Sequence, residues 1–186
     1  MKLGHGFILS LAVASLATLS PATAEAEEIR FAQNDVPTVF FINKSDDHNR
    51  VDYAMRLNAD CNAATQEAVF QYWREFESSP PVRTHGLNAL ERVAYGISEQ
   101  HVIRNEGKRD EHTIRLKQLP RPITIVTEKG ADGKCSAYAK VSINGAESRL
   151  VNVYVKLGGF LSSVQYVEIH GKNLTTNAAV MERVKK

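Results

Sequence analysis

The segment richest in candidate ligand-contacting groups is a loop followed by a short predicted helix. Arg83 and His85 lie in the loop, and Glu91, Arg92 and Tyr95 lie in the helix. Small-molecule sites combine a few convergent polar groups of these kinds with an apolar wall, and they favour the mouths of β-barrels. If the protein has a ligand site, we expect it here. The alternative interpretation is that Glu91 and Arg92 form the solvated face of a capped helix, with Tyr95 as a packing residue.

Two further histidines fall in alternating patterns typical of strands. His101 shares a predicted strand face with Glu99, and His170 shares one with Tyr166 and Glu168. Both are candidate wall residues of a polar pocket, and both are equally explained as exposed or hydrogen-bonded strand histidines. A histidine that acts as a base needs an orienting partner and a substrate within hydrogen-bond reach. The sequence identifies neither.

The familiar signatures of catalysis and metal binding are missing from the sequence. It contains no G-x-S-x-G elbow, P-loop, dinucleotide fingerprint, H-E-x-x-H motif or paired C-x-x-C elements. The polar segment 46–49 (DDHN) lies between two strand-like runs, where Asp and Asn are favoured turn formers, so we interpret it as a hairpin tip rather than a metal site. The sequence therefore indicates no catalytic residue, no metal and no cofactor.

Length and charge limit the class of protein. The chain has 186 residues, of which 43% are hydrophobic, and its 23 basic and 21 acidic side chains give a net charge of +2. These values fit one globular domain and argue against disordered, coiled-coil, collagen-like and polytopic membrane proteins. A nearly balanced charge also gives no electrostatic footprint for nucleic acid, so we expect no nucleic-acid partner.

The N-terminus has the pattern of an export signal. Lys2 is followed by the apolar run Phe7–Leu19, and Ala22-Thr23-Ala24 provides small residues for cleavage. The run is shorter than the ~20 apolar residues of a spanning helix, although an uncleaved anchor is the alternative. We predict a signal peptide over residues 1–24, an extension over 25–37 and one domain over 38–186. The product is expected to be periplasmic or secreted, with no transmembrane anchor after cleavage.

The chain has two cysteines, Cys61 and Cys135. An exported chain meets an oxidising compartment, so we predict a disulfide between them, with two separate buried thiols as the alternative. Closing a loop of this length stabilises a fold by about 4 kcal/mol in the chain-entropy model.

Period-two alternation dominates the rest of the chain and predicts antiparallel strands. It is clearest over residues 51–57, 135–143 and 151–157, while 38–42 and 69–73 are apolar on both faces and are predicted to be central strands. We count about nine strands and one helix. Hairpin spacing then predicts a mainly β, single-domain fold, either a barrel-like antiparallel sheet or a sandwich.

Three local predictions accompany this fold. The helix over residues 87–96 should be capped by Asn88 and bury one apolar face, which contains Leu87, Leu90, Val93 and Ala94. A three-residue bulged loop around Asn144-Gly145 should pair Ile143 with Glu147. The C-terminal residues 174–186 fit either a short helix or an edge strand.

Several segments resemble an exported bacterial family known as domain of unknown function 4833. They are residues 39–58 (VFFINKSDDHNRVDYAMRLN), 71–76 (QYWREF), 87–97 (LNALERVAYGI) and 166–176 (YVEIHGKNLTT), and the most specific piece is ERVAYG at 91–96. The resemblance implies a β-rich exported domain and no particular activity. Neither cysteine belongs to the family pattern.

Three functions remain open from the sequence. The first is a binding module for a small or partly apolar ligand, which a filled interior would rule out. The alternative is a structural or protein-interaction domain of the cell envelope. A hydrolase has the least support; it predicts a cleft where histidines and carboxylates converge, and His85, His101 and His170 within reach of one another would strengthen it.

Overall fold

The computed structural model describes residues 36–45, 47–76, 83–103, 111–158 and 163–185. The predicted signal peptide, and residues 25–35 of the predicted extension, lie outside these ranges. No helix within them is long and apolar enough to cross a membrane.

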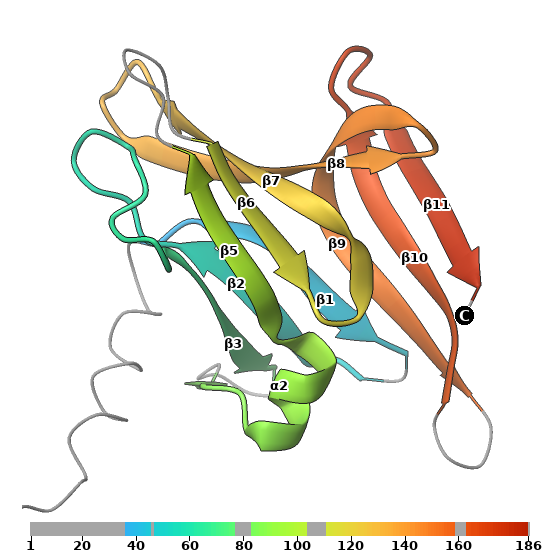
Figure 1. Ribbon diagram of the computed structural model, residues 1–186. Helices are drawn as coiled ribbons and strands as arrows, with labels where there is room; N and C mark the ends of the chain where they lie inside the picture. The colour runs from blue at the N-terminus through green and yellow to red at the C-terminus, as the bar shows by residue number, and fades with distance from the viewer. Residues whose placement is uncertain (1–35, 46, 77–82, 104–110, 159–162, 186) are drawn as a thin grey trace, which may run out of the picture.

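Eleven strands and one short helix make up the described ranges (Figure 1). The helix is α2, Ala89–Tyr95, and the strands are β1 Thr38–Lys44, β2 Arg50–Met55, β3 Val69–Glu75, β4 Arg83–His85, β5 Ile97–Ile103, β6 Glu111–Leu116, β7 Leu119–Lys129, β8 Cys135–Ile143, β9 Ala146–Gly158, β10 Ser163–Asn173 and β11 Ala179–Lys185. The predicted mainly β class with one helix is confirmed. The two strands beyond the predicted nine are the three-residue β4 and the C-terminal β11, which resolves the ambiguity of residues 174–186 in favour of an edge strand.

All eleven strands belong to one sheet. Its main order is β4-β3-β2-β1-β9-β8-β7-β6-β5. The long strand β9 pairs with β8 through its first half and with β1 through its second half, while β10 and then β11 extend the sheet from its other edge. Because β1 and β9 run parallel, the sheet is mixed rather than purely antiparallel as predicted.

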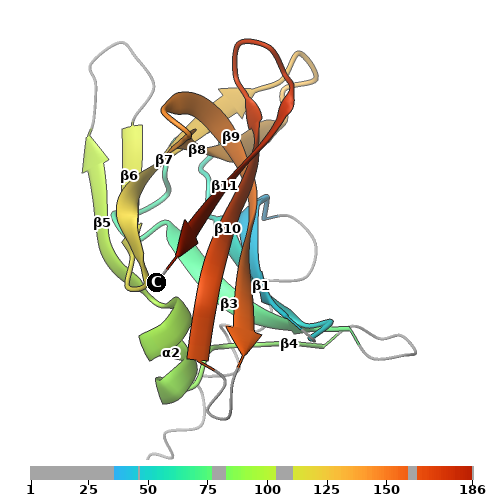
Figure 2. The same ribbon diagram turned by 90° about the vertical axis from the view of Figure 1, so that its right-hand side faces the viewer.

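The sheet curls without closing into a barrel, and we call the strands β4-β3-β2-β1 and β8-β7-β6-β5, which lie on either side of β9 in the strand order, its two arms. Figure 2 shows β5 and β6 on one side and β1 and β3 on the other. No ladder joins the described strands β3 and β5. Instead, the side-chain amide of Gln100 accepts a hydrogen bond from Val69 N at 3.2 Å and donates one to Val69 O at 2.8 Å. One side chain thus takes the place of a backbone partner across the opening.

The space between the two arms is filled by side chains. Phe40 and Tyr53 stack with ring centroids 4.4 Å apart, and Tyr53, Ile114 and Ile123 are completely buried. Interiors packed in this way resemble those of small barrels that hold no ligand. The interior therefore gives no support to a small or partly apolar ligand bound inside the fold.

The helix α2 does not bury the predicted apolar face. Leu90 and Val93 are 83% and 58% exposed, Ala94 is also exposed, and no residue of the helix is buried. The prediction is wrong because the helix contacts the sheet at its two ends, through the buried Leu87 before it and through Tyr95, whose carbonyl oxygen accepts a hydrogen bond from the Tyr53 hydroxyl. The predicted cap is present: Asn88 and Glu91 form a reciprocal capping box.

The β8–β9 hairpin has a two-residue loop, so the predicted three-residue loop is wrong. Ile143 pairs with Ala146, and the central residues Asn144 and Gly145 have φ values of 51° and 81°, as a type I′ turn requires. The error arises because Val151 is a bulge with no partner in the ladder between β9 and β10. The residues of β9 that face the core are therefore even-numbered before it, as Leu150 is, and odd-numbered after it, as Val153 is. The alternation of its second half therefore cannot be extended back to the hairpin.

Cys61 and Cys135 form the disulfide that the sequence predicts, with Cα atoms 5.1 Å apart. The bond connects the loop after β2 with the start of β8. It therefore joins the two arms of the sheet.

Candidate functional site

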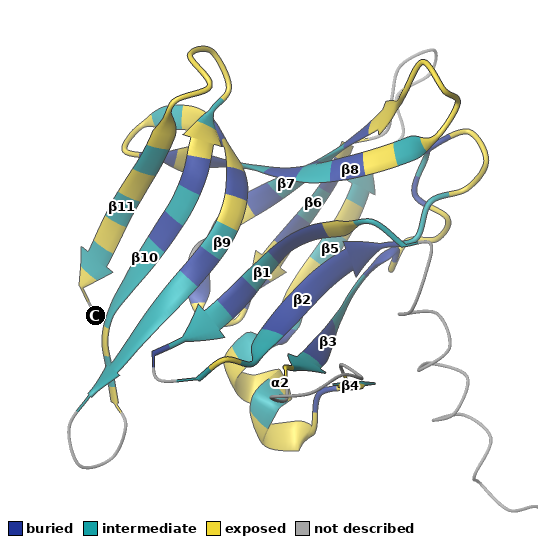
Figure 3. Ribbon diagram, turned by 180° about the vertical axis from the view of Figure 1, so that it is seen from behind, coloured by how far each residue is buried: buried dark blue, intermediate teal, exposed yellow. Residues whose placement is uncertain are grey.

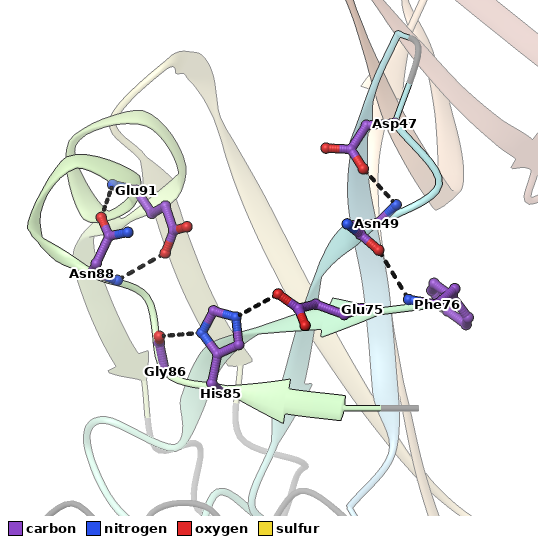
Figure 4. Close-up of polar contacts among 8 residues, drawn as sticks. All are labelled: Asp47, Asn49, Glu75, Phe76, His85, Gly86, Asn88 and Glu91. Atoms are coloured by element: carbon purple, nitrogen blue, oxygen red, sulfur yellow. Dashed lines mark hydrogen bonds and ion pairs between the residues drawn. The ribbon is translucent and has the colours of Figure 1, made fainter. Parts of the chain in front are cut away.

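The predicted loop-and-helix site lies where β4 leads into α2, as Figure 4 shows. The imidazole of His85 has two acceptors: Gly86 O lies 3.0 Å from Nδ1 and Glu75 Oε1 lies 3.3 Å from Nε2. Burial opposes charge on the ring, but the hydrogen bonds to Gly86 and Glu75 outweigh it and raise the pKa of His85 above its ordinary value. Arg83 begins the same strand, opposite Glu75 in the β3–β4 ladder. His85 thus connects β3 to the loop before the helix.

The other predicted residues of this region also make internal contacts. Arg92 Nε donates a hydrogen bond to Leu87 O at 2.8 Å. The Tyr95 ring lies 5.9 Å from the Trp73 ring, and burial raises the pKa of the Tyr95 phenol. The structure therefore brings Arg83, His85, Arg92 and Tyr95 to one end of the fold. The contacts of His85, Arg92 and Tyr95 hold the loop and the helix in place.

The hairpin between β1 and β2 forms around a local turn, as predicted for its sequence. Asp47 Oδ1 accepts a hydrogen bond from Asn49 N at 2.8 Å, and Asn49 Oδ1 accepts one from Phe76 N at 2.9 Å (Figure 4). Asp47 also forms an ion pair with Lys44 at 3.2 Å. Among the described residues, no three His, Cys, Asp or Glu side chains are grouped to hold a metal ion.

The remaining two candidate histidines lie elsewhere. His101 is on the edge strand β5, with a 68% exposed side chain 3.7 Å from Glu99. His170 is on β10, where Nε2 lies 3.1 Å from Glu168 Oε2. Within the described part of the chain, no hydrogen bond or ion pair joins any two of His85, His101 and His170. These three histidines therefore do not form the cluster that would have strengthened the hydrolase hypothesis.

A second concentration of polar and aromatic groups covers the side of the sheet that faces away from the core. Residues paired directly across a ladder point to the same face, so the register defines two rows across β3, β2, β1, β9, β10 and β11. We call these rows the outer face: Arg74, Arg50, Asn43, Tyr154, Glu168 and Arg183 in one, and Tyr72, Asp52, Phe41, Asn152, His170 and Met181 in the other. Figure 3 views the molecule from the side on which β1, β2, β9 and β10 lie in front.

A buried carboxylate organises one end of the outer face. Asp52 is completely buried: Oδ1 accepts a hydrogen bond from Arg50 Nε at 2.7 Å, whereas Oδ2 lies 2.7 Å from Arg74 Nε as an ion pair without the geometry of a hydrogen bond. Arg74 Nη2 also donates to the Tyr72 hydroxyl at 2.8 Å. A buried charge is tolerated when it is paired and hydrogen-bonded. Here the pairing fixes two guanidinium groups side by side and leaves the triplet with a net charge of +1.

Aromatic rings hold Arg50 in place from the other side. Its guanidinium carbon lies 4.3 Å from the centroid of the Phe41 ring and 5.1 Å from that of Phe76, within the range of cation–π contacts. Among the described residues, Nη1 and Nη2 of Arg50 have no hydrogen-bond partner. The guanidinium is therefore positioned by its Nε and its faces, while the terminal N–H donors remain available.

The opposite end of the outer face repeats this arrangement in a more exposed form. Arg183 donates two hydrogen bonds to Glu168, at 3.0 and 2.6 Å, and its guanidinium carbon lies 4.3 Å from the Tyr166 ring centroid. The hydrogen bonds from Arg183, and to a smaller extent the one with His170, lower the pKa of Glu168. The carboxylate is thus occupied by its own arginine.

The outer face is more basic than the chain as a whole. Its two rows hold three arginines and two carboxylates. Lys156 and Lys185 both pair with Tyr166, two residues before Glu168 on β10, and therefore lie on the same face beside the rows. The full chain, in contrast, has 23 basic and 21 acidic side chains. Positive charge is therefore concentrated on this face.

Sequence reasoning missed the outer face because residues 69–73 were interpreted as apolar on both sides. A signal was present in every second residue: Phe70, Tyr72, Arg74 and Phe76 alternate along β3 and its continuation. Arginine between aromatic residues at this spacing indicates stacking on one strand face. Only the ladder register, however, shows that Arg50 and Asp52 of β2 complete the group.

A hollow of about 540 Å³ lies beside the β8–β9 turn. Its wall contains Arg121, which donates hydrogen bonds of 3.0 and 2.6 Å to Glu182, and Lys140, which lies 3.1 Å from Glu147. The hydrogen bonds from Arg121 and from Asn144 N lower the pKa of Glu182 to about 2. These two basic and two acidic groups form two ion pairs and balance in charge, so the hollow has no net charge to select a ligand.

Comparison with known proteins identifies the family of this chain and nothing further. Neither the curated proteins nor the solved structures give a match to this chain. The family described as domain of unknown function (DUF4833) matches residues 40–183, which span the sheet from β1 to β11. The chain belongs to the DUF4833 family.

Proposed function

We propose that the protein is an exported binding module whose ligand is acidic and docks on the outer face. The observation that carries this proposal is the pair Arg50 and Arg74, held side by side on the buried Asp52. Guanidinium groups bind carboxylate, sulfate and phosphate through paired N–H donors. Because Asp52 and the rings already fix these arginines, little side-chain freedom is lost when a ligand binds.

Export is part of the same proposal. Residues 1–24 act as a signal peptide, and the chain that remains after Ala24 is periplasmic or secreted. The Cys61–Cys135 disulfide supports this, because such bonds persist in oxidising compartments. An exported protein with a basic outer face can reach acidic polymers of the envelope or its surroundings.

The alternative of an envelope protein-interaction domain has its own observation. Leu90 and Val93 expose apolar side chains on α2. Two side chains form too small a patch to specify a partner, whereas the outer face extends over six strands. The sequence placed the expected ligand at the loop and helix, but His85, Arg92 and Tyr95 make internal contacts there, so we propose the outer face instead.

Retention on immobilised heparin, used as a polyanion probe, tests the proposal. The variant Lys156→Gln with Lys185→Gln removes two charges beside the outer face, and the matched control Lys117→Gln with Lys134→Gln removes two exposed charges from turns elsewhere. We expect the first variant to bind about tenfold more weakly at physiological salt and the control to match the wild type. Equal behaviour of the two variants, or no retention of the wild type, would contradict the proposal.

A further inference from the structure

We infer that the outer face binds an acidic oligosaccharide that lies across the strands, an inference that rests on the proposed acidic ligand. The proposed function requires only positive charge. The arrangement of polar and aromatic groups between the charged ends adds the class of ligand.

The first step concerns the length of the row. Arg50 on β2 and Arg183 on β11 are separated by four ladder steps through Asn43, Tyr154 and Glu168. Neighbouring strands lie roughly 4.8 Å apart, so the two arginines are separated by about 19 Å along the row. A single carboxylate, sulfate or phosphate cannot contact both. A ligand that uses both ends must be extended and must carry more than one acidic group.

The second step concerns the middle of the row, which is uncharged. Asn152 Nδ2 donates a hydrogen bond to Asn43 Oδ1 at 3.1 Å. In the described part of the chain, this leaves the Asn43 amide nitrogen and the Asn152 amide oxygen without partners, as a donor and an acceptor side by side. Both side chains are half-buried. Paired amides of this kind match sugar hydroxyls, which donate and accept at the same atom.

Tyr154 lies next to these amides and supplies a ring. It is Asn43's partner in the β1–β9 ladder, and its side chain is half-buried. No hydrogen bond or arginine stack is found for Tyr154 among the described residues, in contrast to Tyr72 and Tyr166. A tyrosine combines an apolar ring with a polar tip, which suits the apolar face and hydroxyl rim of a pyranose. A linear polyphosphate can accept hydrogen bonds from the Asn43 amide and the Tyr154 hydroxyl, but it has no hydroxyl donor for the Asn152 oxygen and no apolar face for the Tyr154 ring.

The third step concerns repulsion. The row contains one carboxylate, Glu168, and the neighbouring row contains Asp52. Each accepts hydrogen bonds from an arginine of the outer face. Neither is therefore an unpaired negative charge opposite the acidic groups of the ligand, so a chain of uronate residues would meet no unpaired carboxylate in the row.

Binding of hexagalacturonate to the disulfide-bonded exported chain, measured by calorimetry, tests the inference. We expect it to bind at least about tenfold more tightly than galacturonate alone, because one molecule engages both ends of the row. The comparison probes are the fully methyl-esterified hexamer, which lacks the charges, and a polyphosphate of equal charge, which lacks the sugar. Both should bind more weakly than hexagalacturonate.

Variants of the ring separate sugar recognition from charge. Tyr154→Ala should weaken hexagalacturonate binding about tenfold and leave polyphosphate binding unchanged, while Tyr154→Phe should retain most of the affinity. Tyr138→Ala, on β8 outside the outer face, is the matched control. Thermal unfolding verifies that each variant is folded, and Asn43→Ala provides a second test if Tyr154→Ala is not.

The outcomes distinguish the two proposals. If polyphosphate binds as tightly as hexagalacturonate, or if Tyr154→Ala and Asn43→Ala leave the sugar affinity unchanged, the oligosaccharide inference is overturned and the proposed acidic ligand stands. If neither probe binds the wild type, the proposed function fails as well.

Discussion

At the scale of single residues, Asp52 is the group on which the outer face depends. Its carboxylate is completely buried, yet both partners are arginines whose side chains remain about a quarter exposed, at 28% and 26%. A hydrophobic residue at this position would remove the need for pairing and would often be no less stable. The carboxylate therefore does more for the orientation of Arg50 and Arg74 than for the stability of the sheet.

Removal of one arginine should reveal this dependence. Arg74→Met keeps the apolar stem and leaves Asp52 with one partner, so we expect the free energy of unfolding to fall by roughly 3 kcal/mol. The control Arg115→Met breaks an exposed pair with Glu99, whose side chains are 47% and 53% exposed, and should change it by less than about 1 kcal/mol. Urea unfolding of both variants provides the measurement. A loss of similar size in the two would show that Asp52 is not confined as described.

At the scale of elements, α2 shows how a correct local pattern can give a wrong orientation. The sequence correctly predicts the helix and its Asn88 cap, because capping is decided within four residues. It does not reveal which face is buried, since a helix of two turns can contact the sheet through its ends. Leu87 is therefore 3% exposed while Leu90 is 83% exposed, although both fit the same apolar stripe.

This orientation gives a matched pair of substitutions. Leu87→Ala should lower the free energy of unfolding by about 2–5 kcal/mol, because it removes buried methyl groups and leaves a cavity. Leu90→Ala, three residues later, should change it by no more than about 0.5 kcal/mol. Chemical denaturation of the two variants measures the difference. Equal losses would mean that the helix buries the stripe predicted from sequence.

The strands show the same division between what is local and what is not. Alternation predicts most strands, and Asn144-Gly145 correctly places a hairpin, because both depend on neighbouring residues. The parallel β1–β9 pair joins segments that are distant in sequence, and the bulge at Val151 is defined by the pairing of β9 with β10, so the alternation of β9 alone does not reveal either. The outer face depends on these pairings. This explains why His85 and Arg92 could be grouped from sequence, whereas Arg50 and Arg183 could not.

At the scale of the whole molecule, the open sheet raises the question of what keeps its two arms together. The ladder path from β2 to β8 runs through β1 and β9, and across the opening Gln100 supplies a pair of side-chain hydrogen bonds. The disulfide offers a direct covalent connection, because Cys61 follows β2 and Cys135 begins β8. It closes a sequence separation of 74 residues, which limits the freedom of the unfolded chain.

The double variant Cys61→Ser with Cys135→Ser should therefore lower the free energy of unfolding by about 4 kcal/mol, since the longer the loop, the greater the entropy that the unfolded chain regains. Urea unfolding without reductant gives this value, and the wild type unfolded with reductant should agree with it. The outer face should keep its affinity for heparin as long as the variant is folded, because its six strands are joined by their own ladders. Loss of affinity in the folded variant would show instead that the arms must be linked for the outer face to form.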